Sequence, residues 1–254
     1  MKQLLQKICW LSVAVIAFGF NCKAQKLELS AGLNTGASNI TGLLATSESY
    51  YNVNYYIENK YNTGSIYGHK LTFSYGAYIK AQLVTLSGFI AGADGGYEVL
   101  RSKIDLTSVQ KTLYFINYLS APPDIPTGNT PAKGNVILTN QFINLSPYAG
   151  YRVKANHVNI DLIAGTEIGF ALRSSQQIKV ESPDHFNITY VVSKPPTDIR
   201  LRGGIAINYK LVALNLSYAR GLTNYFKGYP YLQDAAYGKA YSQVIRMGVS
   251  YRIR

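Results

Sequence analysis

Apolar and polar residues alternate one by one along several long segments of this chain. Between Lys70 and Leu83 the odd-numbered positions are apolar or aromatic, whereas most of the even-numbered positions are polar or glycine. Successive side chains of a β-strand point to opposite faces of a sheet, so this segment has one apolar and one polar face. Roughly eight such segments follow one another, joined in turn by a very short and a long connection. The pattern is typical of a transmembrane β-barrel, whose outer face meets lipid and whose lumen is polar.

The alternation therefore predicts an all-β fold, a closed antiparallel transmembrane β-barrel of about eight strands. Three connections are short and four are long. With an even number of strands, both termini lie on the periplasmic side with the short turns, and the four long loops are extracellular. The expected strands span residues 26–34, 70–82, 85–101, 141–154, 158–172, 198–210, 212–221 and 241–254.

The long loops are expected at residues 35–68, 102–140 and 174–197 and after Gly221. Prolines and glycines between residues 122 and 134 predict that the second loop is irregular. Several strands are nevertheless longer than the 9 to 11 or so residues that a tilted strand needs to cross a bilayer. We therefore expect the sheet to project beyond the membrane on the loop side.

Residues 1–24 have the pattern of a secretory signal peptide. Two lysines precede an apolar run over residues 8–20, and a short polar stretch then leads to the small residue Ala24. We expect cleavage after Ala24, so that residues 25–254 form the barrel domain. The alternative is a lipoprotein leader acylated at Cys22, which the large residues directly before that cysteine disfavour.

Charge and tyrosine content point to a membrane surface. The formal net charge is +12, a balance that often indicates nucleic-acid binding. Here the lysines and arginines form no run, so we expect no nucleic acid and favour the anionic headgroups of outer-membrane lipids as partners. The 22 tyrosines suit the boundary between hydrocarbon and water. Pattern and composition together predict the outer membrane of a Gram-negative cell.

Charged residues on the polar faces predict a salt-bridged lumen. The interior of an eight-stranded barrel is just wide enough for side chains to fill it, so inward charges have to pair with one another. The favoured interpretation is a closed barrel, and the alternative is a narrow gated channel in which one pair exchanges partners. Strand parity and depth pair Glu28 with Arg252, Asp94 with Arg246, Asp161 with Arg152, and Glu167 with Arg202.

The sequence contains no constellation that indicates catalysis. A hydrolase needs a nucleophile, a base within hydrogen-bond reach and an orienting group. His69 and His185 are expected on the outer side and His157 in a periplasmic turn, without a cysteine or carboxylate cluster that would complete a metal site. We therefore expect no enzyme activity, no metal and no cofactor. A lipid-modifying enzyme is the more distant alternative.

Tyrosines are concentrated in the first and fourth long loops. Aromatic side chains bury much area at interfaces, although an aromatic girdle is the simpler explanation. Our hypothesis is that the two loops form a tyrosine-lined outer surface that binds another envelope protein or a surface glycan. A structural or binding role for the barrel would follow. The tyrosines assigned to this surface are Tyr50, Tyr51, Tyr55, Tyr56, Tyr61, Tyr225, Tyr229 and Tyr231.

The end of the chain resembles a known family. The hairpin IAINYKLVALNLSYARG at residues 205–221 and the final residues 248–254 look like the closing half of the PorT-like family of small outer-membrane β-barrels. Such barrels commonly end in an aromatic residue, whereas this chain ends in Ile253 and Arg254, with Tyr251 the nearest aromatic. The resemblance implies an outer-membrane barrel. The family name also implies a link to secretion, which no residue here carries.

Overall fold

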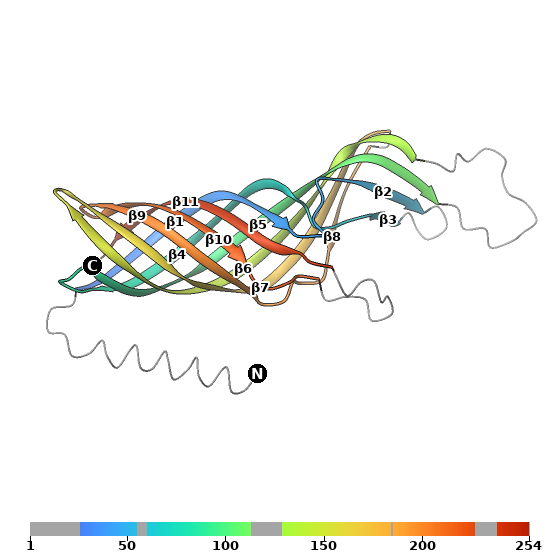
Figure 1. The fold of residues 1–254 in the computed structure, drawn as a ribbon. Coiled ribbons are helices and arrows are strands. Elements are labelled where there is room, and N and C mark those ends of the chain that lie inside the picture. Colours follow the sequence, from blue (N-terminus) through green and yellow to red (C-terminus); the bar gives the residue numbers. More distant parts are fainter. Residues whose placement is uncertain (1–25, 55–59, 113–128, 184, 227–237, 254) are drawn as a thin grey trace, which may run out of the picture.

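The computed structural model describes residues 26–54, 60–112, 129–183, 185–226 and 238–253. Within these residues eight strands form a closed ring in which each strand is antiparallel to both neighbours (Figure 1). The predicted eight-stranded closed barrel is confirmed. In order around the ring the strands are β1 (Lys26–Thr41), β4 (Lys70–Val84), β5 (Phe89–Thr112), β6 (Asn129–Ala155), β7 (Val158–Ser182), β9 (Asp198–Tyr209), β10 (Val212–Gly221) and β11 (Tyr241–Arg252).

The ring closes between β1 and β11. Their register runs from Ser30 opposite Arg252 to Thr41 opposite Tyr241. Closure pairs the backbone groups of both strands within the sheet, as the interior of a bilayer requires because it offers no water as a partner. The first and the last strand therefore replace two free edges by one continuous ladder.

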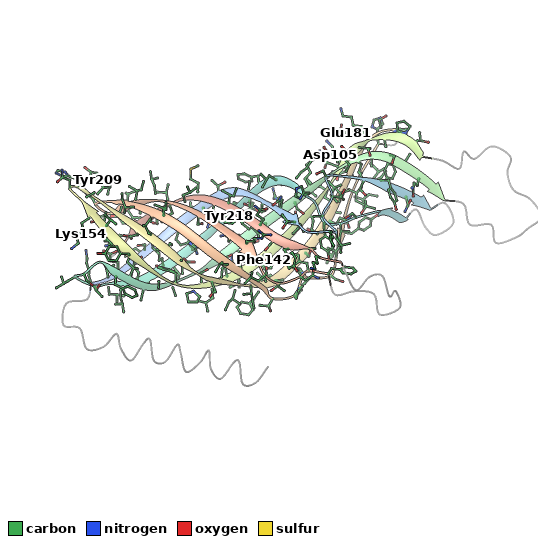
Figure 2. All side chains as sticks on the ribbon, viewed as in Figure 1. Asp105, Phe142, Lys154, Glu181, Tyr209 and Tyr218 are labelled. Atoms are coloured by element: carbon green, nitrogen blue, oxygen red, sulfur yellow. The ribbon has the colours of Figure 1, made fainter. Side chains whose placement is uncertain are left out.

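Short turns join the strands at one end of the barrel, where β1 also begins and β11 ends. The turns lie at residues 85–88, 156–157 and 210–211. Asn156 and Lys210 have φ angles of 48° and 51°, in the left-handed region that tight turns use and that asparagine tolerates well. Lys154 and Tyr209 mark this end of the molecule in Figure 2.

A belt of exposed apolar side chains surrounds the barrel. On β6 it runs from Val153 to Ile143, ten residues apart, and a rise of about 3.4 Å per residue with a tilt of about 40° gives a height of about 26 Å. An outer-membrane barrel has an apolar band of about 25 Å. The strand therefore leaves the membrane close to Gln141. Other members of the belt, each more than 45% exposed, are Leu33, Ile79, Leu145, Leu162, Leu214, Met247 and Val249.

Three ring strands continue beyond the belt, where further strands join the same sheet. β5, β6 and β7 are joined there by β2 (Glu48–Asn54), β3 (Lys60–Thr63) and β8 (Phe186–Val191). The order across this sheet is β3-β2-β5-β6-β7-β8, with β2 parallel to β5 and the other pairs antiparallel. In Figure 1 it extends to the right of the barrel. We call it the external sheet domain: β2, β3, β8 and residues 101–112, 129–141 and 173–182.

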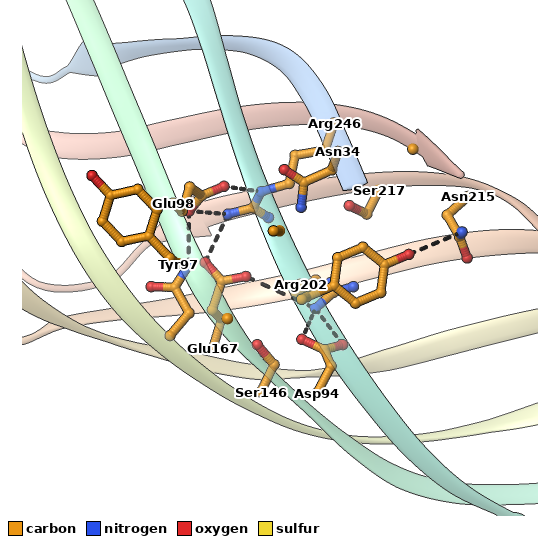
Figure 3. A pocket seen from close by; sticks show the side chains of 15 residues that line it. Asn34, Asp94, Tyr97, Glu98, Ser146, Glu167, Arg202, Asn215, Ser217 and Arg246 are labelled. Atoms are coloured by element: carbon orange, nitrogen blue, oxygen red, sulfur yellow. Dashed lines mark hydrogen bonds and ion pairs between the residues drawn. The ribbon is translucent and has the colours of Figure 1, made fainter. Parts of the chain in front are cut away.

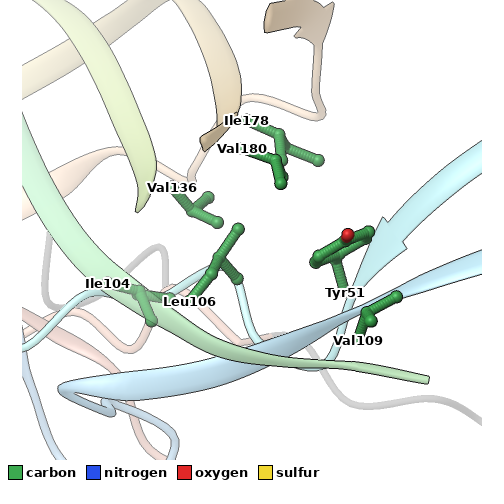
Figure 4. Close-up of a cluster of buried hydrophobic side chains, with 7 residues drawn as sticks. All are labelled: Tyr51, Ile104, Leu106, Val109, Val136, Ile178 and Val180. Carbon is green, nitrogen blue, oxygen red and sulfur yellow. The ribbon is translucent and has the colours of Figure 1, made fainter. Parts of the chain in front are cut away.

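The external sheet domain has its own hydrophobic core (Figure 4). Tyr51 on β2 and Phe186 on β8 come from opposite parts of the sheet, yet their ring centroids are 5.6 Å apart in an edge-to-face contact. Gln176 on β7 also donates a hydrogen bond of 2.8 Å to the Thr63 hydroxyl on β3. The sheet is therefore curled around its core. The buried members of the core are Tyr51, Ile104, Leu106, Val109, Val136, Ile178 and Val180.

The polarity of the two faces is exchanged where the strands leave the membrane. Along β6, Asn144 and Ser146 point into the barrel, whereas Val136 and Leu138 on the same face are buried in the apolar interior above it. The opposite face changes from exposed apolar residues to polar ones beginning at Gln141. In lipid a barrel is apolar outside, and in water a sheet is apolar inside. The exchange therefore marks the boundary between the two solvents.

The expected loop boundaries were wrong in part. Strands occupy much of the predicted second loop, because β5 continues to Thr112 and β6 begins at Asn129. The predicted third loop contains the end of β7 and all of β8, and the first contains β2 and β3. The exchange of faces makes a continuing strand look like the end of the pattern. The expectation that the sheet projects beyond the membrane is confirmed.

Ile178→Ala should destabilise the external sheet domain by about 2–4 kcal/mol, because it leaves a cavity in the core around a side chain that is 1% exposed. Amide hydrogen exchange of detergent-solubilised protein should show faster exchange in β7 and β8 and unchanged exchange in β10 and β11. Ile137→Ala, on the outer face of the same sheet, is the matched control and should have a smaller effect. Equal effects of the two changes would contradict the assignment of this core.

Candidate functional site

The lumen near the short turns contains a buried cluster of ionised side chains. The Arg152 guanidinium donates to Asp161 at 2.6 Å and to Glu28 at 2.9 Å. Arg252 lies 3.3 Å from the same Glu28 carboxylate, and Gln82 donates to it at 2.8 Å. Glu28, Arg152 and Asp161 are all less than a tenth exposed. A buried charge is tolerated only when it is paired and hydrogen-bonded, and this cluster meets that condition.

A larger network fills the lumen toward the external side (Figure 3). Arg246 donates to Glu98 at 2.9 Å and to Glu167 at 2.8 Å. Arg200, which is fully buried, donates to Glu98 at 3.0 Å and also to Glu167. Its Nε donates to Asp198 at 2.6 Å. These five side chains share their hydrogen bonds. Removal of any one of them would therefore leave another buried charge with fewer partners.

The structure brings three of the four expected pairs into contact, one of them at a longer distance, and gives Asp94 a different partner. Arg152 meets Asp161, and Arg252 meets Glu28. Asp94 was expected opposite Arg246 but receives Arg202 at 2.8 Å. The expected pair of Arg202 with Glu167 is a longer contact of 3.9 Å. The shear of the barrel displaces partners along the axis, which parity alone does not reveal.

Sequence reasoning missed three members of the network: Glu98, Asp198 and Arg200. Glu98 lies four residues after Asp94 on the same face of β5, and Arg200 lies two residues before Arg202 on β9. The alternation of side chains along a strand could have shown that Glu98 and Arg200 point into the lumen. Asp198 was treated as the start of a strand, yet its carboxylate accepts hydrogen bonds from Tyr225 at 2.5 Å and Ser242 at 2.7 Å.

An apolar layer covers the network at the external end of the barrel. The Phe142 ring lies 4.9 Å from the Arg200 guanidinium carbon. The side chains beside Asp94, Glu98 and Arg246 leave a cavity of about 40 Å³, which holds at most a few water molecules. Packed charges and an apolar layer therefore occupy the lumen in succession. The buried members of that layer are Ile40, Leu100, Phe142, Tyr225, Ala240 and Val244.

The expected tyrosine surface is corrected at two positions. Tyr51 is fully buried in the core of the external sheet domain, and Tyr225 is 6% exposed and bonded to Asp198. Both rings lie in apolar cores. A tyrosine ring can pack there like that of a phenylalanine when its hydroxyl group finds a hydrogen-bond partner. Tyr50 on β2 is half-buried. Tyr61 belongs to β3, but its side chain is not described. The remaining tyrosines assigned to this surface lie outside the described residues: Tyr55, Tyr56, Tyr229 and Tyr231.

The three histidines do not meet one another. The Nδ1 atom of His69 lies 3.3 Å from the carbonyl oxygen of Ile40, His157 is in a short turn, and His185 precedes β8. In the described part of the chain, no group of three or more histidine, cysteine, aspartate or glutamate side chains is placed to hold a metal ion. The described part of the chain also includes no helix of the length and apolar content that a membrane span requires.

The outer face of the external sheet domain is polar. Gln177 donates a hydrogen bond of 2.9 Å to Asn187, and Lys103 lies 3.1 Å from Asp105. A hydrogen bond from Lys70, together with Lys103, holds the pKa of Asp105 below its usual value. That carboxylate is therefore ionised at neutral pH and binds Lys103 of the domain and Lys70 at the start of β4.

Comparison with known proteins bears on the fold. No protein-family model and no curated protein matches the sequence. Ail, the attachment invasion locus protein of Yersinia pestis, solved with the heparin analogue sucrose octasulfate, is 10% identical, with a TM-score of 0.37 over 90% of this chain and 99% of that one. Neisserial surface protein A is 12% identical, with a TM-score of 0.36 over the same shares. A Pseudomonas aeruginosa FadL homologue is 7% identical, with a TM-score of 0.22 over 89% of this chain and 90% of that one.

The fold is that of a closed eight-stranded antiparallel β-barrel. The height of its apolar belt agrees with a membrane span.

Arg246→Met should lower the stability of the barrel by about 3–5 kcal/mol, because it leaves the Glu98 and Glu167 carboxylates buried with fewer partners. The midpoint of urea unfolding in detergent, followed by the heat-modifiable mobility of the barrel on gels, measures the loss. Adding Glu98→Gln to this variant should restore part of the midpoint, since it removes one of the uncompensated charges. Lys154→Met, at an exposed position beside a short turn, should leave it unchanged. An unchanged midpoint for Arg246→Met would contradict the network.

Proposed function

We propose that this chain is a closed outer-membrane barrel that holds a binding domain at the cell surface and has no catalytic activity of its own. The observation that carries the proposal is that β5, β6 and β7 each take part in two structures along their length. In the membrane these strands enclose a lumen filled with paired charges, and beyond it they build a domain with its own core. The external sheet domain is then the part that meets a partner.

The filled lumen supports a closed barrel over a gated channel. A conducting path would have to separate Arg200 and Arg246 from Glu98 and Glu167, all of which are nearly fully buried. Breaking one buried pair typically costs several kcal/mol. The apolar layer around Phe142 would also have to open. Exchange of a single ion pair, as the channel alternative requires, would leave the other obstacles in place.

The external sheet domain supports a binding role. It is continuous with three strands of the barrel, so its position relative to the membrane is fixed, and rigid scaffolds that present variable surfaces are common among binding proteins. Its outer face carries amide and hydroxyl groups, including those of Gln177, Asn187 and Thr189. Such a surface suits a polar partner, either another envelope protein or a surface glycan. Tyr51 and Tyr225 are core residues, so they are no longer part of the proposed tyrosine surface.

Export and family remain proposals. Residues 1–24 retain the pattern of a cleaved signal peptide and lie outside the described residues. The hairpin of β9 and β10 and the last strand, β11, retain the resemblance to the PorT-like barrels. We extend that resemblance to the outer-membrane location alone. A role in secretion is not part of the proposal, because no described residue supports it.

Purified barrel reconstituted in planar bilayers should give no steady conductance, because the lumen is filled. Simultaneous removal of the network charges, as in Glu98→Ala with Arg200→Ala and Arg246→Ala, should produce openings if that variant still folds. Heat-modifiable mobility on gels verifies the fold. Steady openings of the unaltered protein that disappear in Arg246→Ala would favour the gated channel instead.

A photo-reactive amino acid in place of Thr189, on the outer face of β8, should cross-link the partner in intact cells. The same group at Leu214, which is 57% exposed in the apolar belt, is the control and should yield lipid adducts only. Equal cross-linking of protein or glycan at both positions would argue against the external sheet domain as the binding site. Loss of the Thr189 product in cells that lack the identified partner would establish specificity.

A further inference from the structure

The wall formed by β5, β6 and β7 presents three chemical tiers to the outside, one above another. Register pairs across the strands define the rows, which run perpendicular to the tilted strands. The lowest tier is the apolar first row, and the middle tier holds Arg173 in the second row and Arg101 in the third. Hydroxyl and amide groups of the third and fourth rows form the upper tier. From the membrane upward the rows are Tyr97, Ile143 and Phe170; then Val99, Gln141 and Arg173; then Arg101, Thr139 and Ser175; then Lys103, Ile137 and Gln177.

Two arginines stand at the height where the apolar belt ends. Arg173 is exposed on β7, and Arg101 is half-buried on β5. The guanidinium carbon of Arg101 lies 5.5 Å from the centre of the Tyr75 ring, a belt residue that is 42% exposed. Tyr75 belongs to β4, on the side of β5 away from β6, so Arg101 packs at the edge of the wall beside the apolar belt. Two strand spacings and one step of two residues separate the arginines by about 12 Å between Cα atoms, with Thr139 and Gln141 between them.

The charges of this wall are balanced elsewhere, but not at the two arginines. Higher up, Lys103 lies 3.1 Å from Asp105, and Lys179 lies 3.2 Å from Glu181. Within the described residues neither Arg101 nor Arg173 has a carboxylate within 4 Å. Guanidinium groups at a membrane surface bind phosphate as a planar, bidentate partner. A membrane anion at this height would find two guanidinium groups that no protein carboxylate of the described residues occupies.

We infer that the β5–β6–β7 wall is a binding site for a phosphorylated glycolipid of the surrounding outer leaflet. Acyl chains lie against Ile143 and Phe170, the phosphate lies between Arg101 and Arg173, and the sugars rest on Thr139, Ser175 and Gln177. The order of the tiers matches the order of the lipid's parts, which no soluble anion reproduces. The inference rests on the proposed membrane location and is independent of the partner of the external sheet domain.

The opposite wall supplies a matched control. Arg220 on β10 is also exposed and points outward at the external end of its strand, opposite Gln243 on β11. β10 ends at Gly221 and β11 begins at Tyr241, so these two strands provide no polar sheet face above the cation. Arg220→Gln therefore removes a cation at the rim without touching the three-tiered wall.

Lipid A, a phosphorylated glycolipid, serves as the probe for the test. The barrel is reconstituted in phosphatidylcholine nanodiscs that contain a small fraction of lipid A, and native mass spectrometry counts the lipid A molecules it retains. Arg101→Gln with Arg173→Gln should lower the affinity by roughly tenfold or more, because each charge-assisted contact is lost. Arg220→Gln should leave it unchanged. Heat-modifiable mobility reports correct folding of each variant, so a failure of the barrel itself is distinguished from a failure of the site.

Two further arms identify the ligand without any variant. Enzymatically dephosphorylated lipid A should bind the unaltered protein as weakly as lipid A binds the double variant. Phosphatidylglycerol, which has a phosphate and no sugars, should also bind more weakly than lipid A. Equal retention of lipid A by the double variant, equal binding of phosphatidylglycerol, or displacement of lipid A by millimolar inorganic phosphate would each overturn the inference.

Discussion

Closure of the sheet between β1 and β11 is the constraint on which the rest of the structure depends. A bilayer interior offers no hydrogen-bond partner, so each backbone group of a spanning strand must be paired within the sheet. The ladder from Ser30 to Thr41 against β11 achieves this. Closing the ring with eight strands then fixes the width of the lumen. That width obliges inward side chains to pack against one another, and the charged ones to pair.

The inward charges follow from this width. Six carboxylates point into the lumen or its external end, and arginines contact every one of them: Glu28, Asp94, Glu98, Asp161, Glu167 and Asp198. A buried ion network does not add stability over an apolar core. In a barrel the inward face is polar because the outward face has to be apolar on alternate residues. The network therefore makes that polar face compatible with burial.

The sequence predicts the ring well and the external sheet domain poorly, for one physical reason. Alternation identifies strands wherever lipid faces one side, and the predicted start of β4 at Lys70 and of β7 at Val158 agree with the structure. Above the membrane the alternation continues with its faces exchanged, so Val136 and Ile178 look like an interruption of the pattern. Ion partners are harder still: residue parity places Asp94 in the lumen, but its partner Arg202 is set by the stagger between non-neighbouring strands β5 and β9.

No flexible joint separates the external sheet domain from the barrel along β5, β6 and β7. Each of these strands passes through the boundary as one strand, with a β-bulge in the β6–β7 ladder at Gln141 and Phe142. A force applied to the domain from outside would therefore be transmitted straight into the membrane-embedded ladders, without a hinge that could absorb it. A partner of the proposed binding role would meet the domain in a single orientation, so little rotational freedom of the domain would remain to be lost on association. The barrel and the external sheet domain thus share β5, β6 and β7 and form one continuous structure.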